Sequence, residues 1–253
     1  MLIKNEEEVR EREYFNGLAK EKGVHWWGNL TQAGQIRQLV RAELAVRCAQ
    51  INEGDTILEI GCSEGDFTKR LLEVTNEVKI TAIDISPELI ELAKKKISSD
   101  NVRFEVGNIS LLDYKDESFN AVVGNAVLHH LNLDKGLHEI VRVLKEGGRI
   151  FFAEPNMLNP QIFLEKNVGF IGRRLQNSPD ETAFFRWQIK KTLKKYGFVE
   201  IVVKPFDFLH PATPKALIPI VMKAGLFLER MPLVREIAGS LIISGRKVDK
   251  GLC

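Results

Sequence analysis

The sequence predicts an α/β fold in which short buried strands alternate with helices around a doubly wound sheet. Three observations support this fold class. Short runs rich in β-branched and apolar residues recur along the chain, a glycine-containing turn follows the first run, and residues at helical spacing follow most of the others. The runs that we expect to be strands are 56–60, 78–84, 101–108, 119–125, 149–155, 197–204 and 237–248.

Composition and charge narrow the range of partners and compartments. The 253 residues are 44% hydrophobic and 28% charged, as in an ordinary globular protein. A formal net charge of +2 gives no reason to expect a nucleic-acid partner. Cys48, Cys62 and Cys253 have neither disulfide nor metal-site spacing, so we expect no metal. With no recognisable signal peptide and no apolar run of membrane-spanning length, a cytoplasmic location is expected.

The first 50 residues precede the first strand and are predicted to form a helical lid. Helices are expected over 6–22 and 35–50, and an aromatic stretch that contains Trp26 and Trp27 connects them. Residues 51–155 are expected to form the ligand-binding core. Residues 156–253 are expected to complete the same domain, with insertions on the substrate side at 156–180 and 205–236.

The stretch 56–67 combines a predicted strand, a glycine turn and the start of a helix, which together make the first unit of a nucleotide-type α/β fold. A dinucleotide-binding turn needs a small residue at position 66, but Asp66 would place a carboxylate against a pyrophosphate. The same stretch matches the G-x-S-x-G elbow of hydrolases, with Ser63 as nucleophile. That elbow normally follows several strands, whereas this turn follows the first.

A third interpretation of this turn needs neither a phosphate nor a nucleophile. Small residues stand at alternate positions, Gly61, Ser63 and Gly65, and Glu59 lies inside the strand. Small residues permit close approach of the backbone to a ligand. The pattern resembles motif I of the class I S-adenosylmethionine-dependent methyltransferases.

The next two strands end in polar residues. Asp84 ends the second strand about 20 residues after the turn, where a doubly wound fold places a carboxylate that accepts hydrogen bonds from ribose hydroxyls. Ser86 fits the N-cap and Pro87 the first position of a helix that we expect to reach Ile97. The third strand alternates apolar and polar residues and ends at Asn108.

Two further strands flank an amphipathic helix. The fourth strand ends at Asn125, and an amphipathic helix is predicted over 135–144. Residues 145–148 contain two glycines and are expected to cap this helix, because glycine readily adopts the left-handed conformation. The fifth strand, 149–155, follows directly.

The run from 118 to 155 carries four short motifs in order: S-F-N, L-H-H-L, R-V-L-K-E-G-G and E-P. Their order and spacing resemble the small-molecule (type 11-like) subgroup of the class I, seven-stranded, Rossmann-like methyltransferases. The resemblance covers about residues 55–155. This chain departs from the family pattern at Ser63, where glycine is usual, at Asn108 and Asn120, where acids are usual, and at Glu146, where proline is usual.

The resemblance implies a mostly parallel seven-stranded sheet with an antiparallel last strand and helices on both faces. It also implies S-adenosyl-L-methionine as cofactor and S-adenosyl-L-homocysteine as product. An acid at position 108 would accept from the adenine amino group, and the Asn108 oxygen can still accept, although a plain turn residue is the alternative. Arg37 or Arg41 would meet the methionine carboxylate. The expected cofactor-binding residues are Glu59, Gly61, Cys62, Ser63, Gly65, Asp84, Ile85, Asn108, Ile109, Asn125 and Arg37.

The implied reaction is an in-line displacement, so the protein mainly aligns the acceptor and excludes water. A sugar hydroxyl as acceptor would also need a general base. His129 and His130 follow the fourth strand and Glu154 ends the fifth, and these three are the expected catalytic residues. The alternative for each histidine is packing against the cofactor pocket.

The C-terminal third is expected to select the acceptor. Residues 216–228 are strongly apolar and must be covered. They pack on the chain's own core, form a homodimer face, line a pocket for an apolar or lipid-linked acceptor, or contact a membrane surface as a peripheral site. Two alternatives to a methyltransferase of small, glycan-linked or lipid-linked acceptors stay open: a catalytically silent scaffold that binds the cofactor, and a serine hydrolase that uses Ser63.

Overall fold

A computed structural model describes residues 6–21, 30–168 and 182–249. Trp26 and Trp27 lie outside the described residues. Among the helices that the structure describes, none combines the length and the apolar content that a membrane crossing would require.

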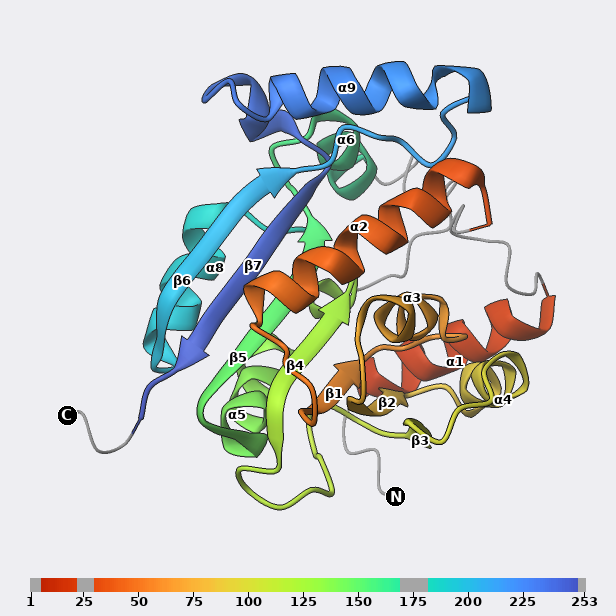
Figure 1. The fold of residues 1–253 in the computed structure, drawn as a ribbon, viewed down its shortest axis with the longest axis vertical. Helices are drawn as coiled ribbons and strands as arrows, with labels where there is room; N and C mark the ends of the chain where they lie inside the picture. The colour runs from red at the N-terminus through yellow and green to blue at the C-terminus, as the bar shows by residue number, and fades with distance from the viewer. Residues whose placement is uncertain (1–5, 22–29, 169–181, 250–253) are drawn as a thin grey trace.

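A mixed sheet forms the centre of the molecule (Figure 1). The described residues contribute seven strands in the order β3-β2-β1-β4-β5-β7-β6. β1 to β5 run parallel, and β7 runs antiparallel to both of its neighbours, β5 and β6. This confirms the predicted fold class, including the antiparallel last strand. The bounds are β1 Thr56–Ile60, β2 Lys79–Asp84, β3 Val102–Val106, β4 Phe119–Asn125, β5 Leu144–Pro155, β6 Phe198–Phe206 and β7 Ser240–Lys247.

Helices precede, connect and follow these strands. The α-helices are α1 Glu6–Glu21, α2 Gln32–Cys48, α3 Asp66–Val74, α4 Pro87–Lys96, α5 Leu133–Val143, α6 Pro160–Asn167, α8 Arg186–Lys195 and α9 Ile218–Leu228. Short 3₁₀ turns are η2 Leu128–His130, η3 Lys215–Leu217 and η4 Val234–Ile237. α4 begins as the sequence predicts, because the Ser86 side chain accepts from the Leu89 backbone N–H and Pro87 occupies the first turn.

Two apolar layers sandwich the sheet, because successive strand residues point to opposite faces. On one face, α2, α3 and α4 pack on strand residues that include Ile57, Ile80 and Phe151. On the other face, α5 and α8 pack on residues that include Leu58 and Phe152. Strands buried on both faces explain the near-continuous apolar runs in the sequence.

One local prediction is wrong. α5 ends at Val143 and β5 begins at once at Leu144, so the glycines at 147 and 148 lie inside the strand and do not cap the helix. The β4–β5 pairing shifts register between the pairs Phe119–Leu144 and Ala121–Arg149. Gly147 has φ +71°, and a side chain at Gly148 would collide with Leu144 and the Lys145 carbonyl. The glycines therefore permit an irregularity in the strand.

The strand topology indicates at which end of the strands a ligand would bind. Parallel strands bring their carboxyl ends to one edge, and the strand order reverses between β1 and β4. Ligands of open α/β sheets bind at such a switch point. The residues at the carboxyl ends of β1 to β5, among them Asp84 and Asn125, therefore gather at one place.

Candidate functional site

The turn after β1 has a backbone that few side chains tolerate. Gly61 has φ +67°, and a Cβ there would lie 2.8 Å from the Cβ of Val127 and closer still to one of its methyl groups. Ser63 has φ +50° and Gly65 has φ +85°. The Cys62 backbone N–H donates to the Ile83 carbonyl at 3.0 Å, which ties the turn to the end of β2. The glycines at 61 and 65 are required by conformation, whereas Ser63 adopts a conformation that glycine would adopt at lower cost.

Asp84, at the end of β2, lies beside this turn. Its two carboxylate oxygens accept from the backbone N–H groups of Ser63 and Ser86, each at 2.9 Å. Burial raises the pKa of Asp84 to about 6, although these hydrogen bonds favour the ionised form. Each oxygen keeps further acceptor capacity, which a ligand hydroxyl can use.

The loop after β3 is joined to the N-terminal helix. The Asn108 side-chain oxygen accepts from the Ser110 backbone N–H at 2.9 Å, and its amide nitrogen donates to Glu8 Oε2 at 2.8 Å. Nearby, the Ser86 hydroxyl donates to the Asn16 side-chain oxygen at 2.6 Å. α1 therefore covers this end of the site and brings an acid to Asn108.

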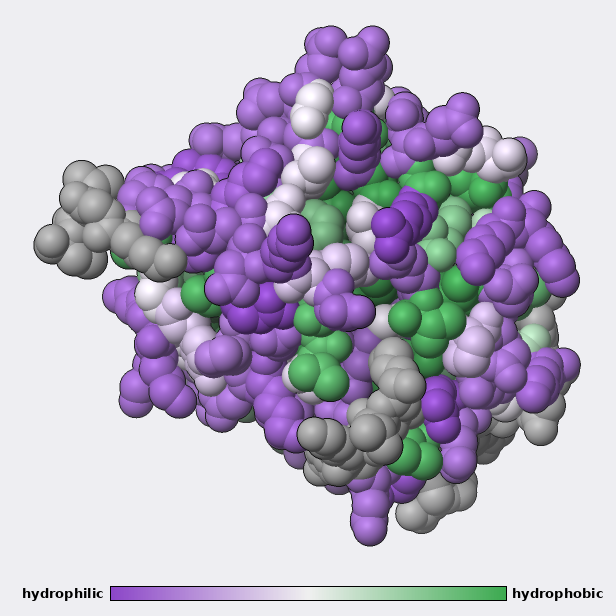
Figure 2. All heavy atoms as spheres, turned by 90° about the horizontal axis from the view of Figure 1, so that it is seen from below, coloured by the Kyte–Doolittle hydropathy of each residue, from purple (hydrophilic) through white to green (hydrophobic). Residues whose placement is uncertain are grey.

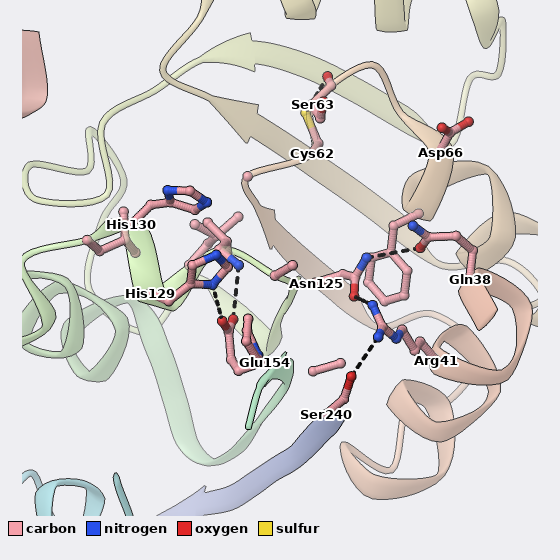
Figure 3. Close-up of a pocket in the computed structure, with 18 of the residues that line it drawn as sticks. Gln38, Arg41, Cys62, Ser63, Asp66, Asn125, His129, His130, Glu154 and Ser240 are labelled. Atoms are coloured by element: carbon pink, nitrogen blue, oxygen red, sulfur yellow. Dashed lines mark hydrogen bonds and ion pairs between the residues drawn. The ribbon is translucent and has the colours of Figure 1, made fainter. Parts of the chain in front are cut away.

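A buried polar network occupies the carboxyl end of β4 (Figure 3). The Arg41 guanidinium donates to Asn125 Oδ1 and to the Ser240 hydroxyl, both at 2.8 Å. Asp207 accepts from Arg37 Nε at 2.7 Å and from Arg41 Nη2 at 3.1 Å. Burial, together with the charge of Arg37, lowers the pKa of Arg41 to about 10. The network holds α2 and the loop before α9 against the end of the sheet.

The η2 turn carries two histidines, and each lies beside a carboxylate. His129 Nδ1 lies 2.7 Å from Glu154 Oε2, and both side chains are buried. The other Glu154 oxygen accepts from the backbone N–H groups of Val127 and Leu128. His130 Nδ1 lies 2.6 Å from Glu11 Oε1 of α1, and the two imidazole rings are 4.1 Å apart. Glu154 therefore orients the His129 ring through Nδ1, and Glu11 lies within ion-pair distance of His130.

A single cavity of about 1180 Å³ joins these groups. Twelve of the residues predicted for the site line it: Gly61, Cys62, Ser63, Asp84, Ile85, Asn108, Ile109, Asn125, Arg37, His129, His130 and Glu154. Glu59 and Gly65 are not among the lining residues. Glu59 is buried within the sheet, where burial raises its pKa to about 8 although the Thr68 hydroxyl favours the ionised form. Gly65 instead begins α3 as its N-cap.

Several lining residues were not predicted from the sequence, among them Glu8, Glu11, Phe15, Gln38 and Asp207. The first three stand at spacings of three and four residues, which places them on one face of a helix. That spacing was the available signal, although it does not say what the face contacts. Within the described ranges no cluster of three or more His, Cys, Asp or Glu side chains is arranged for a metal ion.

Comparisons with known proteins agree on one family. The sequence profile described as "Methyltransferase domain" matches residues 51–200, which is more than half of the chain. A ubiquinone/menaquinone biosynthesis C-methyltransferase of Brucella canis is 27% identical over 213 residues, which cover 79% of this chain and 78% of that protein. A malonyl-[acyl-carrier protein] O-methyltransferase of a Paenibacillus species is 31% identical over 146 residues, and the match spans 53% of this chain and about half (52%) of that enzyme.

A solved structure shares the fold over nearly the whole chain. Geranyl diphosphate C-methyltransferase from Streptomyces coelicolor, in complex with Mg²⁺, geranyl diphosphate and S-adenosyl-L-homocysteine, superposes with a TM-score of 0.67. The match covers 98% of this chain and 100% of that one, at 15% sequence identity. At this identity the similarity establishes the fold alone.

Proposed function

The chain belongs to the methyltransferase domain family, and we propose that it transfers the methyl group of S-adenosylmethionine to a small acceptor that is apolar, lipid-linked or glycan-linked. The observation that carries this proposal is the continuity of the cavity from the glycine turn and Asp84 to His129 and on to α6. Its volume of about 1180 Å³ exceeds the roughly 300–1,000 Å³ usual for one small ligand. A cofactor and an acceptor therefore fit side by side.

The residues present suit this cofactor. The turn 61–65 lets a ligand approach the backbone because position 61 has no side chain, and Ser63 and Cys62 are small. We assign the Asp84 carboxylate to the ribose hydroxyls and the apolar side chains of Ile85 and Ile109 to the two faces of the adenine ring. When bound, the cofactor supplies an electrophilic methyl group on a good leaving group.

The acid that the family pattern has at position 108 is supplied here by another part of the chain. The Asn108 oxygen is already engaged by Ser110, and the Asn108 amide nitrogen holds Glu8. We assign to Glu8 the acceptor for the adenine amino group, with Asn108 as the residue that positions it. α1 then binds the cofactor as well as covering it.

We assign Arg37 to the carboxylate of the methionine portion. Its Nε is held by Asp207 at 2.7 Å, and its side chain lines the cavity. Arg41 instead donates hydrogen bonds to three side chains of the protein, Asn125, Ser240 and Asp207. Arg41 therefore maintains the shape of the site, and Arg37 presents charge to the ligand.

We assign the general base to His129. Glu154 holds its Nδ1 at 2.7 Å and is itself fixed by two backbone N–H groups, so the ring cannot rotate freely. A carboxylate at Nδ1 favours the tautomer that carries its proton on that nitrogen and stabilises the imidazolium that forms when the acceptor loses its proton. The residues of α6 and of the loop 207–212 line the rest of the cavity and would receive the acceptor.

The other two functions receive less support. A serine nucleophile needs an adjacent base; the described hydrogen bonds pair His129 with Glu154, and Ser63 bonds Asp84 through its backbone only. A silent scaffold would bind the cofactor equally well, so only turnover separates it from the proposed function. A cytoplasmic location also stays a proposal.

The test measures transfer of an isotope-labelled methyl group from the cofactor. The purified chain is offered a quinone precursor, malonyl-[acyl-carrier protein], a free glycan and a lipid-linked sugar. The first two follow from the relatives in Brucella and Paenibacillus. Transfer that needs the chain and is lost in both Asp84→Ala and His129→Asn supports the proposal. Cofactor binding with no transfer to any of the four acceptor classes would favour the scaffold.

A further inference from the structure

The segment between β6 and β7 leaves a large apolar surface uncovered. α9 lies across one end of the molecule, beyond the tips of the strands (Figure 1). Its inner side packs through Ile218, Val221 and Met222 against α2 and the preceding loop. Its outer side exposes Ile220 at 65% and Phe227 at 64%. We use "α9 surface" for the exposed hydrophobic side chains Leu217, Ile220, Leu226, Phe227, Met231 and Leu233.

The face at the opposite end of the molecule differs. Figure 2 shows that hydrophilic residues cover most of that face, with hydrophobic residues between them. Scattered apolar residues are normal on a protein surface, whereas a cluster of adjacent ones marks a contact. At 87% exposure, Leu233 has almost no cover from its own chain.

The charges around the α9 surface have one sign. Lys215, Lys223 and Arg230 are exposed and form no ion pair within the part of the chain that the structure describes. The acids of this segment have partners within the chain: Glu229 accepts from the Asp207 backbone N–H at 2.9 Å, and Glu236 pairs with Arg186 at 2.7 Å. The α9 surface is therefore apolar, with Lys223 among its apolar side chains and Lys215 and Arg230 beside them.

The α9 surface also adjoins the mouth of the cavity. The residues just before it in sequence, 208–212, line the cavity, as does Ile162 of α6. Gln161 Nε2 of α6 lies 3.3 Å from His210 Nε2, so α6 and the loop 208–212 meet beside the cavity. On the outside of α6, Phe163 and Leu164 are half exposed and extend the apolar character of this end of the molecule.

We propose that the α9 surface docks on an anionic lipid bilayer, with the cavity mouth facing the lipid. An interfacial site of this kind places apolar side chains below the headgroups and cations beside anionic lipids. A second copy of this chain would instead bring Lys215, Lys223 and Arg230 of both copies together across a two-fold axis. The consequence that a lipid-soluble acceptor enters from the bilayer rests on the proposed function. The docking itself does not.

The test is vesicle flotation with the full chain, without cofactor or acceptor. Vesicles of phosphatidylcholine alone are compared with equal mixtures of phosphatidylcholine and phosphatidylglycerol. We expect binding to the mixed vesicles that falls with added salt. The double variant Ile220→Ser, Phe227→Ser should weaken it by about tenfold or more. Lys223→Gln and Arg230→Gln should each weaken vesicle binding about fivefold.

The control is Val202→Ser, which removes a half-exposed apolar side chain (49%) from β6 and should leave vesicle binding unchanged. Absence of binding to mixed vesicles would overturn the proposal. So would binding that ignores the Ile220 and Phe227 changes, or a dimer in solution that those changes dissociate. Since the assay contains no acceptor, its failure would leave methyl transfer untouched, and failure of methyl transfer would leave vesicle binding standing.

Discussion

Lowering the pH should weaken cofactor binding because it protonates the Asp84 carboxylate. Burial raises the pKa of Asp84 from 3.8 to about 6. We assign its ionised form to the ribose hydroxyls, which donate hydrogen bonds. A protonated carboxyl loses part of that acceptor capacity and adds a donor. The affinity should therefore be complete well above pH 6 and decline as the pH falls through about 6.

The size of the effect follows from the fraction of Asp84 that is ionised. With a pKa of about 6, the ionised fraction is roughly 97% at pH 7.5, half at pH 6 and about 9% at pH 5. The affinity for the cofactor product should thus fall about tenfold between pH 7.5 and 5. An Asp84 with an ordinary pKa of 3.8 would stay about 94% ionised at pH 5, and the affinity would hardly change.

Isothermal titration calorimetry with S-adenosylhomocysteine, at constant ionic strength from pH 7.5 to 5, measures this directly. Asp84→Asn should bind weakly at every pH with a flat profile, because the titrating group is gone. His130 and Glu11 also line the cavity, so His130→Asn serves as a second control and should keep the decline. A flat profile in the unaltered protein, or an unchanged decline in Asp84→Asn, would refute the assignment.

Three further substitutions test the site. Glu154→Gln can still accept from the backbone but donates to His129 Nδ1, so we expect a shifted tautomer in ¹⁵N NMR and turnover lower by about 10²–10⁴-fold, with cofactor affinity kept. Ser63→Gly removes the strain of a left-handed backbone conformation and should stabilise the fold by about 1 kcal/mol, or a few degrees in Tm. Ser63→Ala keeps the Cβ and therefore the strain, so it should not stabilise the fold. Gly61→Ala should destabilise the fold severely and recover in part when Val127→Ala makes room; full stability of Gly61→Ala would contradict the packing argument.

The sheet edge was predictable because its signals are local. β1 and β4 have the bounds that their apolar runs predict. Asp84 ends β2 and Asn108 follows β3, and parallel strands bring their carboxyl ends together whatever the rest of the chain does. The fold class and twelve residues of the cavity lining could therefore be placed before any contact was known.

The contribution of α1 could not be predicted in the same way. Glu8 and Asn108 are 100 positions apart in sequence, and the helix that carries Glu8 reads as a charged surface helix. Its acids are charged residues of a kind that normally face solvent. Only the folded chain shows that Glu8 and Glu11 turn toward the cavity.

The C-terminal part was predictable in outline only. α6 begins at Asn159-Pro160, an N-cap followed by proline, which marks a helix start in the sequence. With eight residues and none of them buried, α6 has no apolar stripe to confirm that signal. The apolar run 216–228 indicates that its side chains need cover, but the sequence does not show that those on the outer side of α9 are exposed.

The acids around the cofactor side of the cavity bear on the relative affinity for cofactor and product. Glu8, Glu11 and Asp84 all line it, and the charge of Glu11 contributes to raising the pKa of Asp84. Such a concentration of negative charge is costly in a partly buried site and is relieved by a bound cation. S-adenosylmethionine carries a sulfonium charge that S-adenosylhomocysteine lacks, so on the proposed function these acids should attract the cofactor more strongly than its product. On the proposed function, the repulsion among these acids would therefore favour exchange of the spent product for new cofactor.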